Sequence, residues 1–245
     1  MKNGLTDGTG ESGRFLKGKT SEGKTVGKEE DGMEADRKEI LRYLGYGKNQ
    51  ADEPVLNLVE SCVEELSRAA EPKSISREFP LTLLPDGEID GGCFKTRSRN
   101  LSKNLKDCIS VVVFAATLGL GADHLIQKYT RIQMSRAVVL QAAAAAMIED
   151  YCNEVCTRLR QEYETRGLYL RPRFSPGYGD FPLSCQPALL DGLEAGKRIG
   201  IKLTDSFLMM PSKSVTAVMG VGQRPFRCEV RGCEACRKTD CLYRR

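Results

Sequence analysis

The stretch RPRFSPGYGDFPLSCQPALLDGLEAGKRIGIKLTDSFLMMPSKSV, residues 171–215, is the one around which this chain is organised. It begins with a loop over residues 171–182 in which three prolines fix φ and remove backbone donors. Gly177 and Gly179 allow tight turns and let a ligand approach the backbone closely. Because the loop is also cationic and aromatic, it suits a small anionic or zwitterionic ligand. The alternative is a well-packed connecting loop that holds no ligand.

Segments on both sides of this loop predict a mixed fold. Residues 187–199 have the apolar spacing of an amphipathic helix, and residues 215–221 that of a strand. Residues 108–117 (CISVVVFAAT) are apolar without alternation, which is typical of a strand buried on both faces. Residues 123–166 are the longest helical tract, with an Ala-rich apolar middle and a break near Thr130.

The N-terminal part of the chain begins with polar, glycine-rich residues 1–36, for which we expect a disordered leader. Helices are predicted over residues 37–44 and from Asp52 onward. A strand over residues 79–84 and a hairpin partner over residues 88–95 follow, with a turn between them.

The segment LGLGAD at residues 118–123 superficially suggests a phosphate-binding loop. It lacks the third glycine of the dinucleotide fingerprint and the Lys-Ser/Thr of a P-loop. We therefore interpret it as a turn in which Asp123 is the N-cap of the next helix. His124 is the only histidine, which excludes His-rich metal sites and leaves little for triad chemistry.

Composition narrows the class of protein. The 245 residues carry a net charge of +4, and they contain no tryptophan and only 7% aromatic residues, so a stacking platform for nucleic acid is not expected. No apolar run is long enough to span a membrane, and the N-terminus has no apolar segment of a secretory signal. We expect a cytoplasmic protein that binds neither nucleic acid nor membrane.

Two motifs in the organising stretch resemble the activation (reactivation) domain of cobalamin-dependent methionine synthase. The first, R-x-x-P-G-Y, is carried by Arg173, Pro176, Gly177 and Tyr178. The second, IG-x-x-LT-[ED]-S-x-x-M-x-P-x-x-SV, is carried by residues 199–215. The upstream strand and Ala-rich helix resemble the short, freestanding bacterial form of this domain, which extends the likeness over residues 37–222.

The resemblance implies an α+β fold, with a curved, mainly antiparallel sheet packed with helices. It implies a stand-alone subunit that binds S-adenosylmethionine and presents the methyl group to the oxidised cobalamin of a split methionine synthase, in support of methionine biosynthesis. The cobalamin is expected on a partner, the cobalamin-binding methionine synthase subunit, because this sequence has no D-x-H-x-x-G motif. The electron is expected from a flavodoxin- or ferredoxin-type donor.

The same resemblance implies the ligand-binding residues. Arg173 is expected to hold the ligand carboxylate, because a guanidinium is a planar, bidentate partner. The backbone from Pro176 through Gly177 can supply hydrogen bonds, and the ring of Tyr178 can cover the ligand or face the corrin. Glu149 is the candidate carboxylate for the sulfonium, the alternative being a solvated helix face. No catalytic residue is expected, since methyl transfer needs no general base. The family's histidine after the tyrosine and its closing pair of tyrosines are missing from this sequence.

The tail of the chain, residues 224–245, carries Cys228, Cys233, Cys236 and Cys241 in a C-x4-C-x2-C-x4-C spacing. Four thiols so close together in a reducing cell predict a zinc site or an iron–sulfur cluster. A redox-active dithiol and unliganded thiols are the alternatives. The flanking arginines suit an acidic electron-donor protein, and they are equally consistent with a solvated tail.

We therefore expect three parts: a leader over residues 1–36, an activation-like domain over residues 37–222, and a Cys-rich basic tail over residues 223–245. Two other functions remain open. One is a non-catalytic adaptor that binds only the cobalamin protein. The other is a redox activator of another corrinoid methyltransferase, with its metal centre in the tail.

Overall fold

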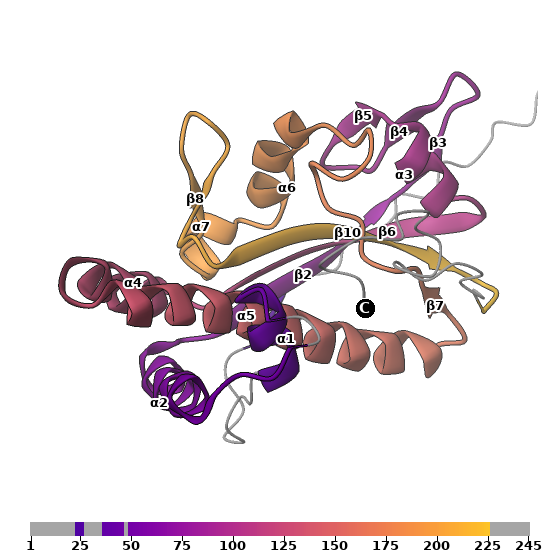
Figure 1. Ribbon diagram of the computed structural model, residues 1–245. Helices are drawn as coiled ribbons and strands as arrows, with labels where there is room; N and C mark the ends of the chain where they lie inside the picture. Colours follow the sequence, from indigo (N-terminus) through magenta and orange to yellow (C-terminus); the bar gives the residue numbers. More distant parts are fainter. Residues whose placement is uncertain (1–22, 27–35, 47–48, 226–245) are drawn as a thin grey trace, which may run out of the picture.

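The computed structural model describes residues 23–26, 36–46 and 49–225 (Figure 1). The helices are α1 (Arg37–Tyr43), α2 (Glu53–Ala69), α3 (Arg99–Asn104), α4 (Leu120–Ile132), α5 (Met134–Glu164), α6 (Gln186–Gly192) and α7 (Ala195–Arg198), with a short 3-10 turn at Leu183–Cys185. The strands are β1 (Lys24–Val26), β2 (Lys73–Pro80), β3 (Thr82–Leu83), β4 (Glu88–Asp90), β5 (Lys95–Arg97), β6 (Cys108–Thr117), β7 (Tyr169–Leu170), β8 (Lys202–Leu203), β9 (Met209–Met210) and β10 (Ser214–Gly222).

An antiparallel sheet with the strand order β1-β2-β6-β10-β7 crosses the centre of the molecule (Figure 1). β10 pairs with β6 along its whole length. On its other side, β10 pairs with β7 at Val221 and Gly222, and a bridge joins Val218 to Phe174. Among the described residues, positions 214–217 of β10 therefore have no strand neighbour on that side.

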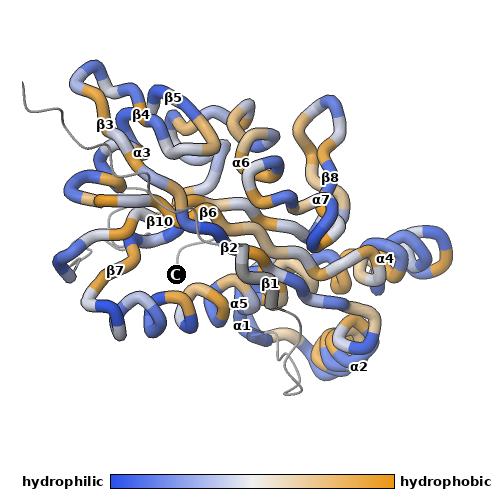
Figure 2. Tube along the Cα trace, turned by 180° about the vertical axis from the view of Figure 1, so that it is seen from behind, coloured by the Kyte–Doolittle hydropathy of each residue, from blue (hydrophilic) through white to orange (hydrophobic). Residues whose placement is uncertain are grey.

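Two layers cover the two faces of this sheet. The helices α1, α2, α4 and α5 form one core with Val112, Phe114 and Ala116 of β6. The other core joins Val111, Val113 and Ala115 to α3, α6 and the small β3-β4-β5 sheet. Since alternate residues of a strand point to opposite faces, burial of both faces explains why residues 111–116 of β6 are all apolar. Figure 2 shows hydrophobic residues gathered along these central strands. The predicted α+β fold with a mainly antiparallel sheet is confirmed.

The N-terminal segment differs from the expectation where the structure describes it. Lys24–Val26 form β1, which pairs with the edge of β2 from Lys24 opposite Ser76 to Val26 opposite Ser74. The polar composition of residues 1–36 hid this short strand, which is defined by its backbone pairing with β2. Residues 1–22 and 27–35 of the expected leader lie outside the described residues.

The helices depart from the predicted boundaries in two places. α4 begins at Leu120, and Gly119, with a φ of 79°, is the residue that turns the chain into it. Asp123 is therefore not the N-cap; it lies inside the first turn. The predicted break in the long helical tract falls at Gln133. The predicted helix over residues 187–199 is interrupted at Glu194, whose φ of 53° is left-handed.

The strand predicted over residues 79–84 is divided between β2, which begins at Lys73, and the short β3. β3 pairs with β4, so the predicted hairpin is confirmed. Within the part of the chain that the structure describes, no helix combines the length and the apolar character that crossing a membrane requires.

Candidate functional site

Arg173 is held against the outer edge of β10 by the backbone on both sides of it. The amide of Arg171 donates to the carbonyl of Gly220 at 2.8 Å, and Phe174 and Val218 exchange two hydrogen bonds of 2.9 Å. Phe174 packs on the core that contains α6. Because successive side chains of an extended segment point to opposite sides, Arg173 points toward α5.

The structure brings together Arg173 and Glu149, two residues that the sequence singled out separately. Nη2 of Arg173 lies 3.3 Å from Oε2 of Glu149 and donates to Oδ1 of Asn153 at 2.7 Å. Glu149 and Asn153 are four residues apart on α5, so they share one face of the helix. The side chain of Arg173 is 19% exposed and that of Glu149 is 45% exposed. The result is a half-buried cation beside a more accessible carboxylate.

Asn153 was not predicted from the sequence as a residue of this site. Its only sequence signal is its place one helical turn beyond Glu149.

Two buried thiols lie close to the Arg173–Glu149 pair. Cys152 and Cys156 are 0% and 1% exposed, and burial raises the pKa of both thiols, with the Arg173 charge opposing the rise. Burial also works against the charge of Arg173, but contact with the Glu149 carboxylate favours that charge, and the pKa of Arg173 is raised. Arg173 is therefore a permanent cation at this site.

The Pro-Gly-Tyr turn of the first motif lies at the surface. Pro176 is buried, whereas Gly177, with a φ of 89°, and Tyr178 are exposed. Two hydrogen bonds close the turn. The amide of Gly177 donates to the carbonyl of Phe181 at 2.8 Å, and the amide of Phe181 donates to the carbonyl of Tyr178 at 3.0 Å. The side chain of Tyr178 is 66% exposed and makes no hydrogen bond within the described part of the chain. The structure thus gives Tyr178 no contact with the Arg173–Glu149 pair.

Asp180, which the sequence argument did not single out, anchors this loop to α3. Its carboxylate accepts hydrogen bonds from the hydroxyl of Ser98 and from the amides of Arg99 and Asn100, the last two at 2.8 and 3.1 Å. The hydrogen bond from Ser98 is the main reason why the pKa of Asp180 is lowered. The preceding Gly179 has a left-handed φ of 55°, and a Cβ on it would lie 2.4 Å from the side-chain Nδ2 of Asn100.

The second motif shapes the approach to β10. The hydroxyl of Thr204 accepts the amide of Leu208 at 3.1 Å, which closes the β8–β9 hairpin. Further along, the carboxylate of Asp123 accepts the amide and the hydroxyl of Ser212 at 2.7 and 2.6 Å. Ser214 donates to the carbonyl of Pro211 at 2.7 Å. The two motifs therefore act on one strand: the second fixes the start of β10, and the first lies beside its middle, where Phe174 pairs with Val218.

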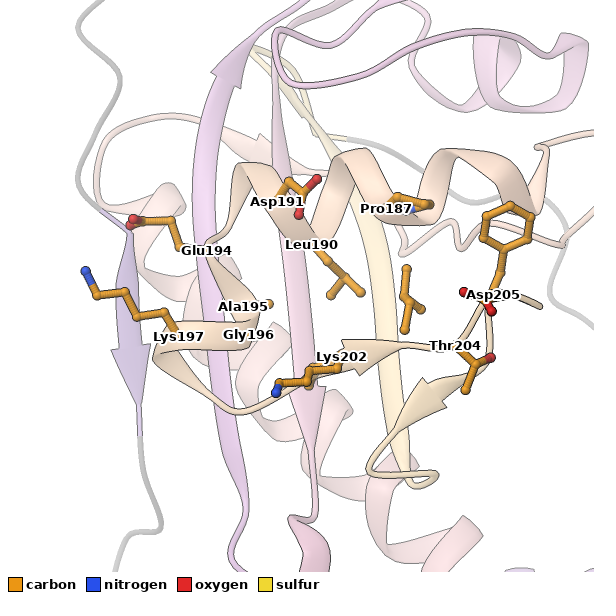
Figure 3. A pocket seen from close by; sticks show the side chains of 13 residues that line it. Pro187, Leu190, Asp191, Glu194, Ala195, Gly196, Lys197, Lys202, Thr204 and Asp205 are labelled. Carbon is orange, nitrogen blue, oxygen red and sulfur yellow. The ribbon is translucent and has the colours of Figure 1, made fainter.

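A cavity of about 610 Å³ lies elsewhere, between α6, α7 and the β8–β9 hairpin (Figure 3). Apolar side chains including Leu190 and Leu203 belong to the core on that face, and the charged Asp191, Lys202 and Asp205 surround them. This cavity opens on the face of the sheet opposite to α5, so it is separate from the Arg173–Glu149 pair.

The predicted metal ligands Cys228, Cys233, Cys236 and Cys241 lie outside the described residues. Among the residues that are described, no group of three or more His, Cys, Asp or Glu side chains is arranged to hold a metal ion.

Comparison with known proteins agrees with this architecture. A family model described as "Vitamin B12 dependent methionine synthase, activation domain" matches residues 99–226, which is more than half of the chain. A crystal structure of the MetH reactivation domain bound to AdoHcy superposes with a TM-score of 0.56 at 17% sequence identity. The match covers 84% of this chain and 80% of that one. At this identity the likeness is one of fold.

Proposed function

The chain belongs to the family of vitamin B12-dependent methionine synthase activation domains, and we propose that it binds S-adenosylmethionine between α5 and β10. In this proposal it acts as a stand-alone activation subunit, with residues 37–222 as the activation unit. It presents the methyl group to the oxidised cobalamin of a separate cobalamin-binding methionine synthase subunit. S-adenosylmethionine supplies the methyl group, and a flavodoxin- or ferredoxin-type protein supplies the electron. Together they return the cobalamin to its methylated form.

The observation that carries the proposal is the contact of Arg173 with Glu149 and Asn153. The amino-acid part of S-adenosylmethionine has a carboxylate and an ammonium, and a sulfonium follows. A guanidinium binds a carboxylate through two parallel hydrogen bonds, the amide oxygen of Asn153 can accept from an ammonium, and the carboxylate of Glu149 has the charge to face the sulfonium. The site therefore supplies a partner of the right charge for each group of the ligand.

Methyl transfer requires few other groups from the protein. Methyl transfer from a sulfonium requires no proton acceptor, so the described residues need only hold the ligand and orient its methyl group. Arg173 is fixed by the backbone bonds to β10, which limits its movement before the ligand arrives. The exposed ring of Tyr178 and the exposed Gly177, which follow the buried Pro176, stand at the surface, where a corrin on a partner could approach. We propose these three residues as part of the site on that basis.

The proposal is tested by methyl transfer in a reconstituted system. The 245-residue protein is mixed with a cobalamin-binding methionine synthase subunit, a reduced flavodoxin and S-adenosylmethionine labelled in its methyl group. We expect label on the cobalamin. With Arg173→Lys, which keeps the charge but loses the planar fork, we expect at least about a tenfold lower rate at limiting ligand.

The matched control is Arg131→Lys, which alters an exposed arginine on α4 and should change nothing. A wild-type protein that transfers no label, or an Arg173→Lys variant as active as the control, contradicts the proposal.

The cysteine spacing of the tail favours a second activity, a metal or redox centre that delivers the electron. We propose zinc or an iron–sulfur cluster on Cys228, Cys233, Cys236 and Cys241; of the two, only the iron–sulfur cluster would deliver the electron, because zinc is redox-inactive and would serve as a structural centre. Anaerobic purification followed by metal analysis and optical spectroscopy tests this. A metal-free, colourless protein with full methyl transfer would remove the proposal, whereas metal without methyl transfer would favour the adaptor or the redox activator of another corrinoid methyltransferase.

A further inference from the structure

Lys213 is a second cation directed at α5. It lies just before β10, and its Nζ donates to the main-chain carbonyl of Gln141 at 3.4 Å. A mid-helix carbonyl is a weak partner at this distance, because it already serves the helix. Among the described residues, no carboxylate forms an ion pair with Lys213. Lys213 is only partly exposed. Its ammonium has three donors, and within the described residues the fold uses one of them, in the bond to Gln141.

The backbone holds Lys213 in place. The carbonyl of Lys213 accepts the amide of Leu118 at 2.9 Å. Its neighbours are tied as well: Ser212 bonds to Asp123, and the hydroxyl of Ser214 bonds to that of Thr117 at 2.8 Å. A lysine whose only role was solubility would need no such restraint. Burial lowers the pKa of Lys213, with Asp123 opposing the change, which agrees with an amine set apart from solvent.

Lys213 and Arg173 mark two ends of one strip. Lys213 meets α5 at Gln141, and Arg173 meets the same helix at Glu149. Eight residues of helix separate these two points, about 12 Å along the axis. Ala145, halfway between them on the same face, is small and partly exposed. Facing this strip is the part of β10, residues 214–217, that has no strand neighbour on its outer side among the described residues.

This spacing fits an extended ligand that has a carboxylate at one end and a nucleoside at the other. With its carboxylate on Arg173, the amino-acid chain of S-adenosylmethionine reaches along the strip and places the adenosine toward Lys213. The ribose hydroxyls and purine nitrogens are acceptors that a lysine can serve. The reverse arrangement would leave the ligand's ammonium and sulfonium without the carboxylate of Glu149.

We propose that Lys213 binds the adenosine part of the ligand whose carboxylate Arg173 holds. The inference rests on the proposed binding of S-adenosylmethionine and adds a binding residue to it. In this arrangement Arg173 binds the amino-acid part of the ligand and Lys213 binds the adenosine part. Methionine and 5′-methylthioadenosine each contain one of these parts, so the two contacts can be tested separately.

The experiment is calorimetric titration of the full protein with S-adenosylmethionine, 5′-methylthioadenosine and methionine. Lys213→Met keeps the length of the side chain and removes the donors. We expect it to weaken binding of S-adenosylmethionine and 5′-methylthioadenosine about tenfold, the range for a hydrogen bond from a charged group, and to leave methionine unchanged. Arg173→Lys should do the opposite, weakening methionine and sparing 5′-methylthioadenosine.

Lys202→Met, an exposed lysine on β8, is the matched control and should behave as wild type in every titration. Thermal unfolding of each variant shows whether a loss of binding reflects a loss of folding. If wild type binds S-adenosylmethionine and Lys213→Met binds all three probes equally well, this inference is wrong and the proposed function stands. If Lys213→Met weakens methionine instead, the ligand lies in the reverse direction and the inference also fails. If wild type binds no S-adenosylmethionine, both this inference and the proposed function are wrong.

Discussion

Glu149 is the residue whose charge we expect to interact most directly with the sulfonium of the proposed ligand. Its carboxylate lies beside Arg173 and is nearly half exposed, so it can approach a ligand without leaving the helix. S-adenosylmethionine and S-adenosylhomocysteine share the carboxylate and the ammonium, and they differ in the positive charge on sulfur. A carboxylate that faces the sulfur therefore distinguishes the two molecules by charge alone.

We expect Glu149→Gln to weaken binding of S-adenosylmethionine about threefold and to change binding of S-adenosylhomocysteine much less, because a partly exposed charge pair contributes modestly. Calorimetry with both ligands measures this. Glu154→Gln, which alters a similarly exposed carboxylate on the same helix, is the control. Equal weakening of both ligands would show that Glu149 does not face the sulfonium.

Among single residues, Asp180 is the one for which we predict an effect on thermal stability. Its folded-state pKa lies below that of an unfolded aspartate, about 3.9. Its contribution is therefore complete above the unfolded pKa and disappears as the pH falls through the folded one. We expect Asp180→Asn to lower Tm by about 2–4 °C at pH 7 and the difference from wild type to shrink below pH 4.

Thermal scans from pH 7 to pH 3 measure that difference. Asp205→Asn removes the same charge from an exposed hairpin position and should shift Tm little at any pH. A pH-independent difference for Asp180→Asn would mean that the carboxylate charge does not hold the loop to α3.

The residues of the site differ in how far the sequence revealed them. Arg173 and Glu149 were identified through motif resemblance, and their contact is a fact that only the fold supplies. Asn153 and Asp180 act on partners 20 and 82 positions away, respectively, and a single sequence gives no signal for such pairings. For Asp123, the N-cap pattern pointed to a local partner, whereas the carboxylate bonds to Ser212, 89 positions further on.

At the scale of the elements, α4 owes its place to a glycine that faces α2. A Cβ on Gly121 would lie 1.9 Å from the main-chain carbonyl oxygen of Ala69, so a larger residue must push the two helices apart. Gly196 in α7 is the opposite case, because the nearest atom to its added Cβ is 3.4 Å away.

We expect Gly121→Ala to cost about 1–3 kcal/mol of unfolding free energy, as overpacking does. Gly196→Ala should be neutral or slightly stabilising, since alanine favours the helix. Urea denaturation of both variants measures the difference. If the two glycines behave alike, the close approach of α4 to α2 is not what requires Gly121.

The same elements show which patterns predict structure well. The position of β6 follows from its apolar run over residues 111–116, which is buried on both faces of the sheet. β2 was missed over its first half because Ile75 is the only apolar residue between Lys73 and Glu78. Burial of Ser74 depends on distant contacts, including a 3.3 Å hydrogen bond from Tyr151. The interruption at Glu194 was hidden because a left-handed glutamate leaves no local signal.

For the molecule as a whole, the sheet separates two chemically different faces. The α5 face carries the three residues that meet at the proposed ligand site, and the cavity beside α6 opens on the other face. β10 connects the two motifs of the organising stretch, since the second motif ends where the strand begins and the first lies beside Val218 in the middle of the strand. At 17% sequence identity, a solved reactivation domain shares the fold of this chain.

The central claim is that this arrangement binds S-adenosylmethionine through Arg173. The most direct test is calorimetric titration of the ligand into the wild-type protein, Arg173→Lys and Arg131→Lys. We predict one saturable site in wild type, the same affinity for Arg131→Lys, and at least about tenfold weaker binding for Arg173→Lys. Absence of binding to wild type, or an Arg173→Lys affinity equal to that of the control, would contradict the account.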